Sequence, residues 1–164
     1  GREAVESVSP RNAPFLSTRE LFVLKAAENE QLRRSWVEGD ETARRDILAR
    51  IASAALPDVM DLTQEPTVEV EWFLSARELC MLMEDLADIP ALHINPGVAD
   101  PNHWRSIAFK GGSETGILNF TTRLEGADGA SHCVVATWNN ADAAVENQQF
   151  ASTYGAMLRV RRAE

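Results

Sequence analysis

The tripeptide Lys110-Gly111-Gly112 is the part of the sequence best suited to chemistry. Lys110 is one of only two lysines among the 16 basic residues of the chain. Apolar residues precede it, which predicts that it stands at the end of a short strand, and the glycines beside it leave the backbone sterically open. An ammonium group next to accessible backbone is suited to hold an anion or an acyl group against a strand edge.

The other residues that commonly carry chemistry are scattered. Cys80 and Cys133 lie in apolar stretches with neither metal-ligand spacing nor a Cys-x-x-Cys pair. We therefore expect two buried free thiols, which behave as small hydrophobic side chains. His93, His103 and His132 are isolated as well, so we expect neither a metal ion nor another cofactor.

Composition limits the class of protein. The 164 residues predict a single domain, with a mainly helical part over 1–102 followed by a sheet and terminal helix over 103–164. With 16 basic and 25 acidic residues the net charge is -9, which disfavours a nucleic-acid partner. We expect no membrane span, because no apolar run approaches the roughly 18 residues that a span needs.

A pattern that starts helices occurs twice. The motif Phe-Leu-Ser-x-Arg-Glu-Leu begins at residue 15 and again at residue 73. Each copy contains a capping box, in which a serine and the glutamate three residues later close the first helical turn. The capping pairs are Ser17 with Glu20 and Ser75 with Glu78. Each copy therefore predicts a helix, and the second helix is expected to end before Pro90.

The remaining segments predict helices first and strands later. A helical run through Leu32 and Trp36 is followed by a helix capped by Asp40. Residues 67–72 alternate like an edge strand but are equally consistent with an extended loop. Residues 89–102 are rich in proline and predict an irregular segment.

The last third of the sequence predicts an antiparallel meander covered by a helix, and the chain as a whole an α+β fold. The expected strands span residues 104–110, 116–124 and 131–138, and a turn over 126–129 joins the last two. The third strand is apolar almost without alternation, which is typical of a central strand, although only one neighbour for it is visible. We expect a long helix from Asn140 onward. Its inner face would carry Phe150, Tyr154 and Met157, and its last turn would carry Arg159, Arg161 and Arg162.

This order of parts resembles the C-terminal half of the penicillin-recognising serine hydrolases, most closely the class A beta-lactamase-like branch. The resemblance is specific in the stretch 109–120, Phe-Lys-Gly-Gly-Ser-Glu-Thr-Gly-Ile-Leu-Asn-Phe, and extends to Val-Ala-Thr-Trp-Asn at 135–139. It implies a site between a helical part and an antiparallel sheet, and a serine nucleophile in a Ser-x-x-Lys motif that forms an acyl-enzyme. Lys110-Gly111-Gly112 falls on the family's Lys-Thr-Gly motif at the sheet edge.

The resemblance also implies roles for single residues. Lys110 would position the proton-transfer network and an anionic substrate group, and the backbone N–H of Ser113 would supply half of an oxyanion hole. The residues that would contact a small-molecule substrate are Gly111, Gly112, Glu114 and Thr115. Members of the family are usually exported beyond the cytoplasmic membrane, which implies an exported or periplasmic protein.

The sequence departs from the family pattern at two points that bear on its activity. Gly111 stands where the family usually has a hydroxyl side chain, and none of the ten serines is followed three residues later by lysine. We therefore expect the C-terminal piece of such a hydrolase, inactive alone, with the strand over 131–138 covered by a missing N-terminal half or by another chain. The alternative is a non-catalytic binding or scaffold domain with the same fold.

Overall fold

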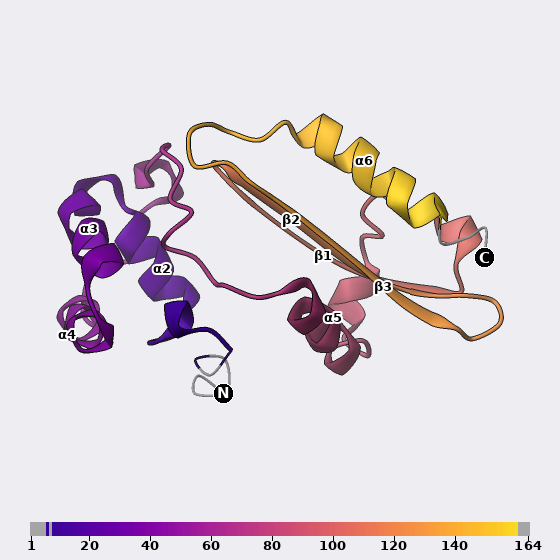
Figure 1. Cartoon of the computed structure of the whole chain (residues 1–164), viewed down its shortest axis with the longest axis horizontal. Coiled ribbons are helices and arrows are strands. Elements are labelled where there is room, and N and C mark those ends of the chain that lie inside the picture. The colour runs from indigo at the N-terminus through magenta and orange to yellow at the C-terminus, as the bar shows by residue number, and fades with distance from the viewer. Residues whose placement is uncertain (1–5, 7, 161–164) are drawn as a thin grey trace. The chain divides into compact units, whose positions relative to one another are not determined.

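The chain divides into two compact units, one ending at Leu74 and the other beginning at Ser75 (Figure 1). The structure is a computed structural model that describes residue 6 and residues 8–160. Helices make up the first unit, whereas the second holds one antiparallel sheet with helices, so the predicted α+β class is confirmed. The second unit begins at Ser75, just before a helix that packs on the sheet of the same unit.

Over residues 8–74, the first unit contains the helices α2 (Thr18–Lys25), α3 (Glu30–Glu38) and α4 (Glu41–Ile51). The predicted caps are confirmed, because the side chain of Ser17 accepts from the Glu20 N–H and that of Asp40 accepts from the Ala43 N–H. Short 3-10 turns span Pro10–Asn12, Ala27–Asn29 and Val59–Asp61. The buried core of this unit consists of Leu16, Leu21, Val23, Leu24, Trp36, Ile47, Leu48, Ile51 and Val70.

Residues 67–72 form turns and bends, which settles the choice between strand and loop in favour of a loop. The loop is held at its C-terminal end. The indole N–H of Trp72 donates to the Leu16 carbonyl (2.7 Å), and the buried amide side chain of Asn12 exchanges two 2.8 Å hydrogen bonds with the Phe73 backbone. A side chain thus satisfies backbone groups that a strand partner would otherwise satisfy.

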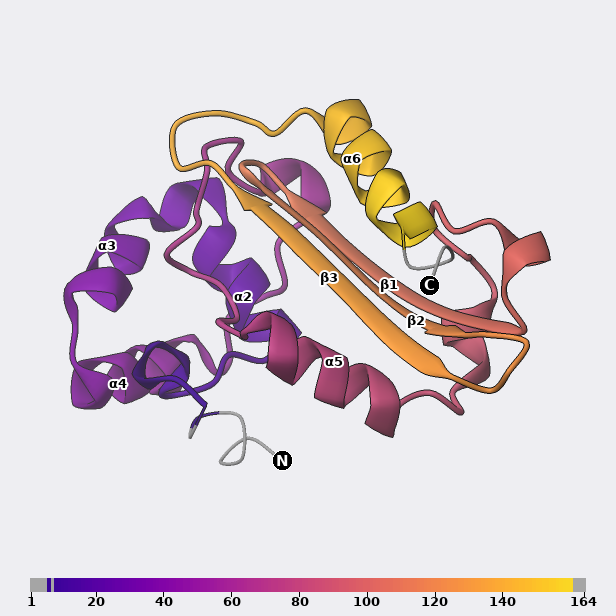
Figure 2. The same cartoon turned by 45° about the vertical axis from the view of Figure 1, so that its right-hand side comes forward.

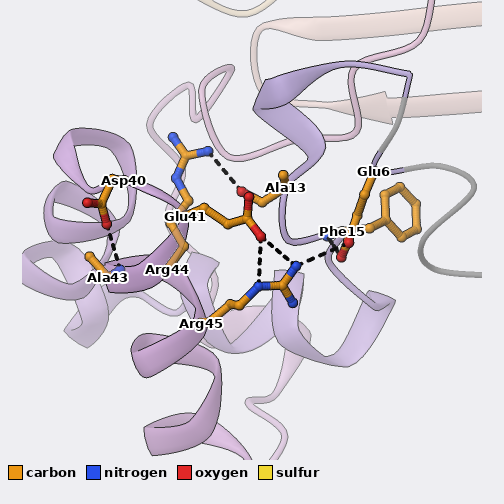
Figure 3. Close-up of polar contacts among 8 residues, drawn as sticks. All are labelled: Glu6, Ala13, Phe15, Asp40, Glu41, Ala43, Arg44 and Arg45. Atoms are coloured by element: carbon orange, nitrogen blue, oxygen red, sulfur yellow. Dashed lines mark hydrogen bonds and ion pairs between the residues drawn. The ribbon is translucent and has the colours of Figure 1, made fainter.

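A cluster of charged side chains ties the start of the described chain to α4 (Figure 3). Arg45 contacts both Glu41 (2.7 Å) and Glu6 (3.2 Å), and Glu6 accepts from the Phe15 N–H (2.8 Å). Arg44 donates to the Trp36 carbonyl (2.8 Å) on the neighbouring helix. Each of these groups has a structural partner, so the cluster positions Glu6 and Phe15 beside α4.

The second unit is built on three strands: β1 (Ser106–Glu114), β2 (Ile117–Glu125) and β3 (Ser131–Asn139). They pair antiparallel in the order β1-β2-β3, which confirms the predicted meander. Helix α6 (Asn147–Val160) covers one face, and α5 (Ala76–Asp85) lies on the other (Figure 2). Two 3-10 turns, Pro90–His93 and Pro101–His103, interrupt the irregular segment before β1.

The core of this unit lies between the sheet and α6. Its buried residues are Ala99, Ile107, Leu124, Val134, Tyr154 and Leu158. The hydroxyl of Tyr154 lies 2.7 Å from the Val134 carbonyl and 2.9 Å from Thr122 Oγ1, and burial raises its pKa to about 12. Tyr154 therefore binds α6 to two strands of the sheet.

Two predicted boundaries of this unit are wrong. Strand β1 runs through Lys110 to Glu114 instead of ending at the lysine. Helix α6 begins at Asn147, not at Asn140. Asn140 instead starts a turn, in which its side chain accepts from the Asp142 N–H (3.0 Å). Met157, which was predicted on the inner face of α6, is 41% exposed, and Leu158 is buried instead. Arg161 and Arg162 lie outside the described residues.

The prediction of free thiols is also wrong, because Cys80 and Cys133 form a disulfide with their Cα atoms 5.8 Å apart. Helix α5 crosses the sheet at the point where the side chain of Cys133 emerges from β3, a contact that spacing along the chain does not reveal. A bidentate ion pair between Glu84 and Arg123 (2.5 and 3.0 Å) supports the same contact and lowers the pKa of Glu84. Helix α5 is therefore held to the sheet covalently and by charge.

Candidate functional site at the outer edge of β1

The predicted site residues lie near the hairpin that joins β1 to β2. Lys110 is paired with Thr121 and Gly112 with Asn119 across the two strands. The turn consists of Thr115 and Gly116, and Gly116 adopts a φ of +80°, a conformation that glycine reaches without a steric penalty. The strand thus continues through both glycines of the Lys-Gly-Gly motif.

The register shows which backbone groups face the outer edge of β1, the edge away from β2. The Asn140 N–H donates to the Gly116 carbonyl (2.7 Å), so this pair is hydrogen-bonded. Because hydrogen-bonded pairs alternate along antiparallel strands, even-numbered residues of β2 bond to β3 and odd-numbered ones to β1. In β1, the odd-numbered residues Phe109, Gly111 and Ser113 therefore direct their N–H and C=O groups outward.

A neighbouring contact supports this assignment. The carbonyl of Ile107, which has the same parity, lies 2.7 Å from His93 Nδ1 of the 3-10 turn Pro90–His93. His93 covers the outer edge at its beginning. The stretch from Phe109 to Ser113 lies farther along the same edge.

Two donors lie on this stretch of the edge. The ammonium group of Lys110 donates to the Gly111 carbonyl, which directs the exposed lysine side chain around the strand to its outer side. The Ser113 N–H points to the same side by the register. A positive charge and a backbone donor on one strand edge can bind a carboxylate, a phosphate or a developing oxyanion.

On the α6 face of the sheet, a cavity of about 390 Å³ adjoins the same three residues, Gly111, Gly112 and Ser113. Its aromatic wall is formed by Phe109 and Phe120, whose ring centroids lie 5.3 Å apart in an edge-to-face arrangement. Asn95, Gly97 and Val98, from the loop before β1, also line the cavity.

The structure brings together only part of the predicted site. Lys110, Gly111, Gly112 and Ser113 share the strand edge, whereas Glu114 is exposed at the end of β1 and Thr115 belongs to the turn. Neither of the last two lines the cavity. The residues that sequence reasoning missed are Asn95, Gly97, Val98, Phe109, Leu118 and Phe120. Strand alternation could have placed Phe109 beside Gly111, but nothing in the sequence shows where the 95–98 loop packs.

Other kinds of site receive no support from the part of the chain that the structure describes. Over residue 6 and residues 8–160, no three His, Cys, Asp or Glu side chains come together as metal ligands do. The helices within that range are all too short or too polar to cross a bilayer. No family model matches this chain, and no curated protein matches it. What the fold and the geometry define is thus an α+β protein with a basic, donor-bearing strand edge.

Proposed function

We propose that the outer edge of β1 is one side of an acyl-transfer site, and that the chain is the C-terminal portion of a beta-lactamase-like serine hydrolase. The observation that carries the proposal is that Lys110 and the Ser113 N–H lie on the same strand edge. The nucleophilic serine would come from residues outside this chain. The 164-residue chain alone would be inactive. The resemblance over residues 109–120 supports the assignment to this class of hydrolase.

The chemistry requires little of the edge beyond charge and hydrogen bonding. A serine oxygen forms a bond to the substrate carbonyl carbon, and the bond from that carbon to the leaving group then breaks. The serine proton passes through a base to the leaving group, and water later releases the acyl group. Ser113 N–H would donate to the oxyanion, and Lys110 would hold an anionic substrate group or assist proton transfer. Removing one such donor typically lowers kcat by about 100- to 1000-fold.

Two further observations support the proposal. A disulfide such as Cys80–Cys133 forms and persists in oxidising compartments, in agreement with an exported protein. Strand β3 is an edge of the sheet formed by the described residues, and parity directs the backbone groups of Val135 and Thr137 away from β2. Such an edge is a template for another strand, which the N-terminal half or a second chain would provide.

One observation favours a different function, a non-catalytic binding or scaffold domain. None of the ten serines in the chain is followed three residues later by lysine. The same strand edge would then hold an anion without acylation. The two functions differ in whether a serine of the complete protein reacts.

A reactive fluorophosphonate probe tests this difference on the protein expressed from its complete gene. We expect one labelled serine, outside the 164 residues, and no labelling of the 164-residue chain alone. Replacing Ser113 by proline removes the outward N–H without breaking a hydrogen bond to β2, because proline is tolerated where the N–H faces away from the sheet. We expect Ser113→Pro to slow labelling by about 100-fold or more.

The matched control is Ser113→Ala, which keeps the backbone N–H and should label at close to the normal rate. Lys110→Ala should slow labelling, and Lys110→Arg should restore part of the rate. Absence of any labelled serine in the complete protein would favour the binding or scaffold domain. Equal labelling of the alanine and proline variants at position 113 would overturn the oxyanion role.

A further inference from the structure

The cavity beside Gly111 differs in chemistry from the strand edge that it adjoins. None of the residues that line it carries a charge, although a quarter of the chain is charged. Its polar side chains are those of Asn95 and Ser113, and the Asn95 side chain accepts from the Gly97 N–H (2.9 Å). A ligand group in this cavity would therefore be apolar and uncharged.

The aromatic wall of the cavity is fixed by the core beneath it. The ring of Phe120 contacts Phe109 (5.3 Å), Phe150 (5.1 Å) and Tyr154 (5.4 Å), each in an edge-to-face arrangement. Edge-to-face packing of this kind favours one ring orientation. The wall is thus a preformed apolar surface, continuous with the core under α6.

Two glycines give the cavity its shape. A Cβ added at Gly97 would lie 2.7 Å from the Phe109 ring, and one added at Gly111 would lie 3.1 Å from it. Gly97 also has a φ of +62°, which disfavours other residues. Phe109 therefore packs against two glycines, and a methyl group on either would force its ring to shift.

We propose that this cavity binds an aryl or branched alkyl group located within a few bonds of the reacting carbonyl of the substrate. An enclosed apolar cavity of about 150 Å³ is large enough to bind benzene, and this one, which is open to solvent, has about 390 Å³. The cavity shares Gly111, Gly112 and Ser113 with the edge that would hold the oxyanion, so a single small molecule reaches both. The substrate class inferred is a hydrophobic ester or amide. This substrate class rests on the proposed acyl-transfer function, whereas binding of an apolar group to the cavity does not.

Binding to the 164-residue chain is measured by nuclear magnetic resonance with phenylacetamide, a neutral amide that carries one aromatic ring. We expect saturable shifts of the backbone amides of Gly97, Phe109, Gly111 and Ser113. Acetamide, which has the same amide group and no ring, should bind at least about tenfold more weakly, because the ring supplies the buried apolar surface. Equal responses to both probes would overturn the inference.

Variants locate the bound ring. Gly111→Ala and Ser113→Phe each add side-chain atoms at a residue that lines the cavity, and each should weaken phenylacetamide binding about tenfold or more. Ser131→Phe is the matched control, since it adds the same ring at an exposed position on the opposite face of the sheet, and it should bind normally. If Gly111→Ala disturbs the fold, as judged by thermal unfolding, Ser113→Phe decides the question.

The two proposals fail in different ways. If phenylacetamide binds but the complete protein has no reactive serine, the cavity is an apolar binding site and the acyl-transfer function is overturned. A reactive serine in a protein whose cavity does not bind phenylacetamide would overturn the substrate class alone.

Discussion

Helices α2 and α5 begin with the same sequence pattern and have different surroundings. In both, the serine N–H donates to the glutamate side chain at 2.7 Å and the glutamate N–H donates to the serine hydroxyl at 3.3 Å. Leu24 of α2 is fully buried, whereas Leu82, which occupies the equivalent position in α5, is 40% exposed. The capping box thus determines where a helix starts, and the packing of other elements determines what the helix buries.

The means that hold the two helices in place differ accordingly. Helix α2 lies in an apolar core, and the buried guanidinium of Arg33 donates to the carbonyls of Leu24 (3.0 Å) and Ala26 (2.5 Å) at its C-terminal end. Helix α5 has a single buried residue, Met83, and relies on the disulfide and on the ion pair of Glu84 with Arg123. Where apolar burial is small, a covalent link replaces it.

The largest expected effect, loss of the disulfide, distinguishes the stability of the two units. The disulfide closes a loop with a sequence separation of 53, for which chain entropy predicts a contribution of about 4 kcal/mol to the free energy of unfolding. We expect the Cys80→Ser/Cys133→Ser variant to lose about this much in the second unit. Hydrogen exchange resolved by residue measures it, with faster exchange in α5 and β3 and unchanged exchange in α2. Faster exchange in both units to the same degree would contradict the difference between them.

The next effect compares equivalent leucines. Leu24→Ala removes a fully buried side chain and should lower the free energy of unfolding by about 3 kcal/mol. Leu82→Ala removes a side chain that is 40% exposed and should lower it by less than about 1 kcal/mol. Urea denaturation monitored by circular dichroism measures both. Similar losses for the two variants would show that α5 is buried by a partner absent from the present structure.

Local features were predictable from the sequence and long-range contacts were not. The caps at Ser17, Asp40 and Ser75 depend on residues within one turn, and the prediction of each was confirmed. The prediction that β1 ends at Lys110 was wrong because glycines weaken a strand locally, whereas pairing with β2 continues through them. The partner strand outweighs the low strand propensity of Gly111 and Gly112.

The candidate site also has a part that the sequence predicted and a part that it did not. The Lys110–Ser113 edge was visible in the sequence as a motif, and its role in acyl transfer stays a prediction. The cavity was not visible, because part of its lining comes from Asn95 and Gly97, whose position depends on the fold of the loop before β1. The disulfide escaped prediction for the same reason, since it joins a helix and a strand that are distant in the sequence.

An alkaline titration examines the second unit alone, because Tyr154 is the only tyrosine of the chain. Its pKa is raised from 10 to about 12, chiefly by burial of the hydroxyl. A raised pKa means that the neutral phenol stabilises the fold, so this contribution is complete below pH 10 and is lost as the pH rises towards 12. Absorbance at 295 nm should show ionisation near pH 12, together with weakened protection of β2 and α6. Ionisation near pH 10 in the folded protein would contradict the buried contacts of Tyr154.

The smallest effects test whether the two caps are equivalent. Ser17→Ala and Ser75→Ala each remove the acceptor for the glutamate N–H, and each should lower the free energy of unfolding by about 1 kcal/mol, measured by urea denaturation. Ser17→Thr and Ser75→Thr keep a hydroxyl and serve as controls that lose only a few tenths of that. Equal losses at the two sites, despite the unequal burial of Leu24 and Leu82, mean that capping energy is set within the first turn. A loss at Ser17 several times that at Ser75 would instead mean that the surrounding core strengthens the cap, and the separation between helix start and helix burial would fail.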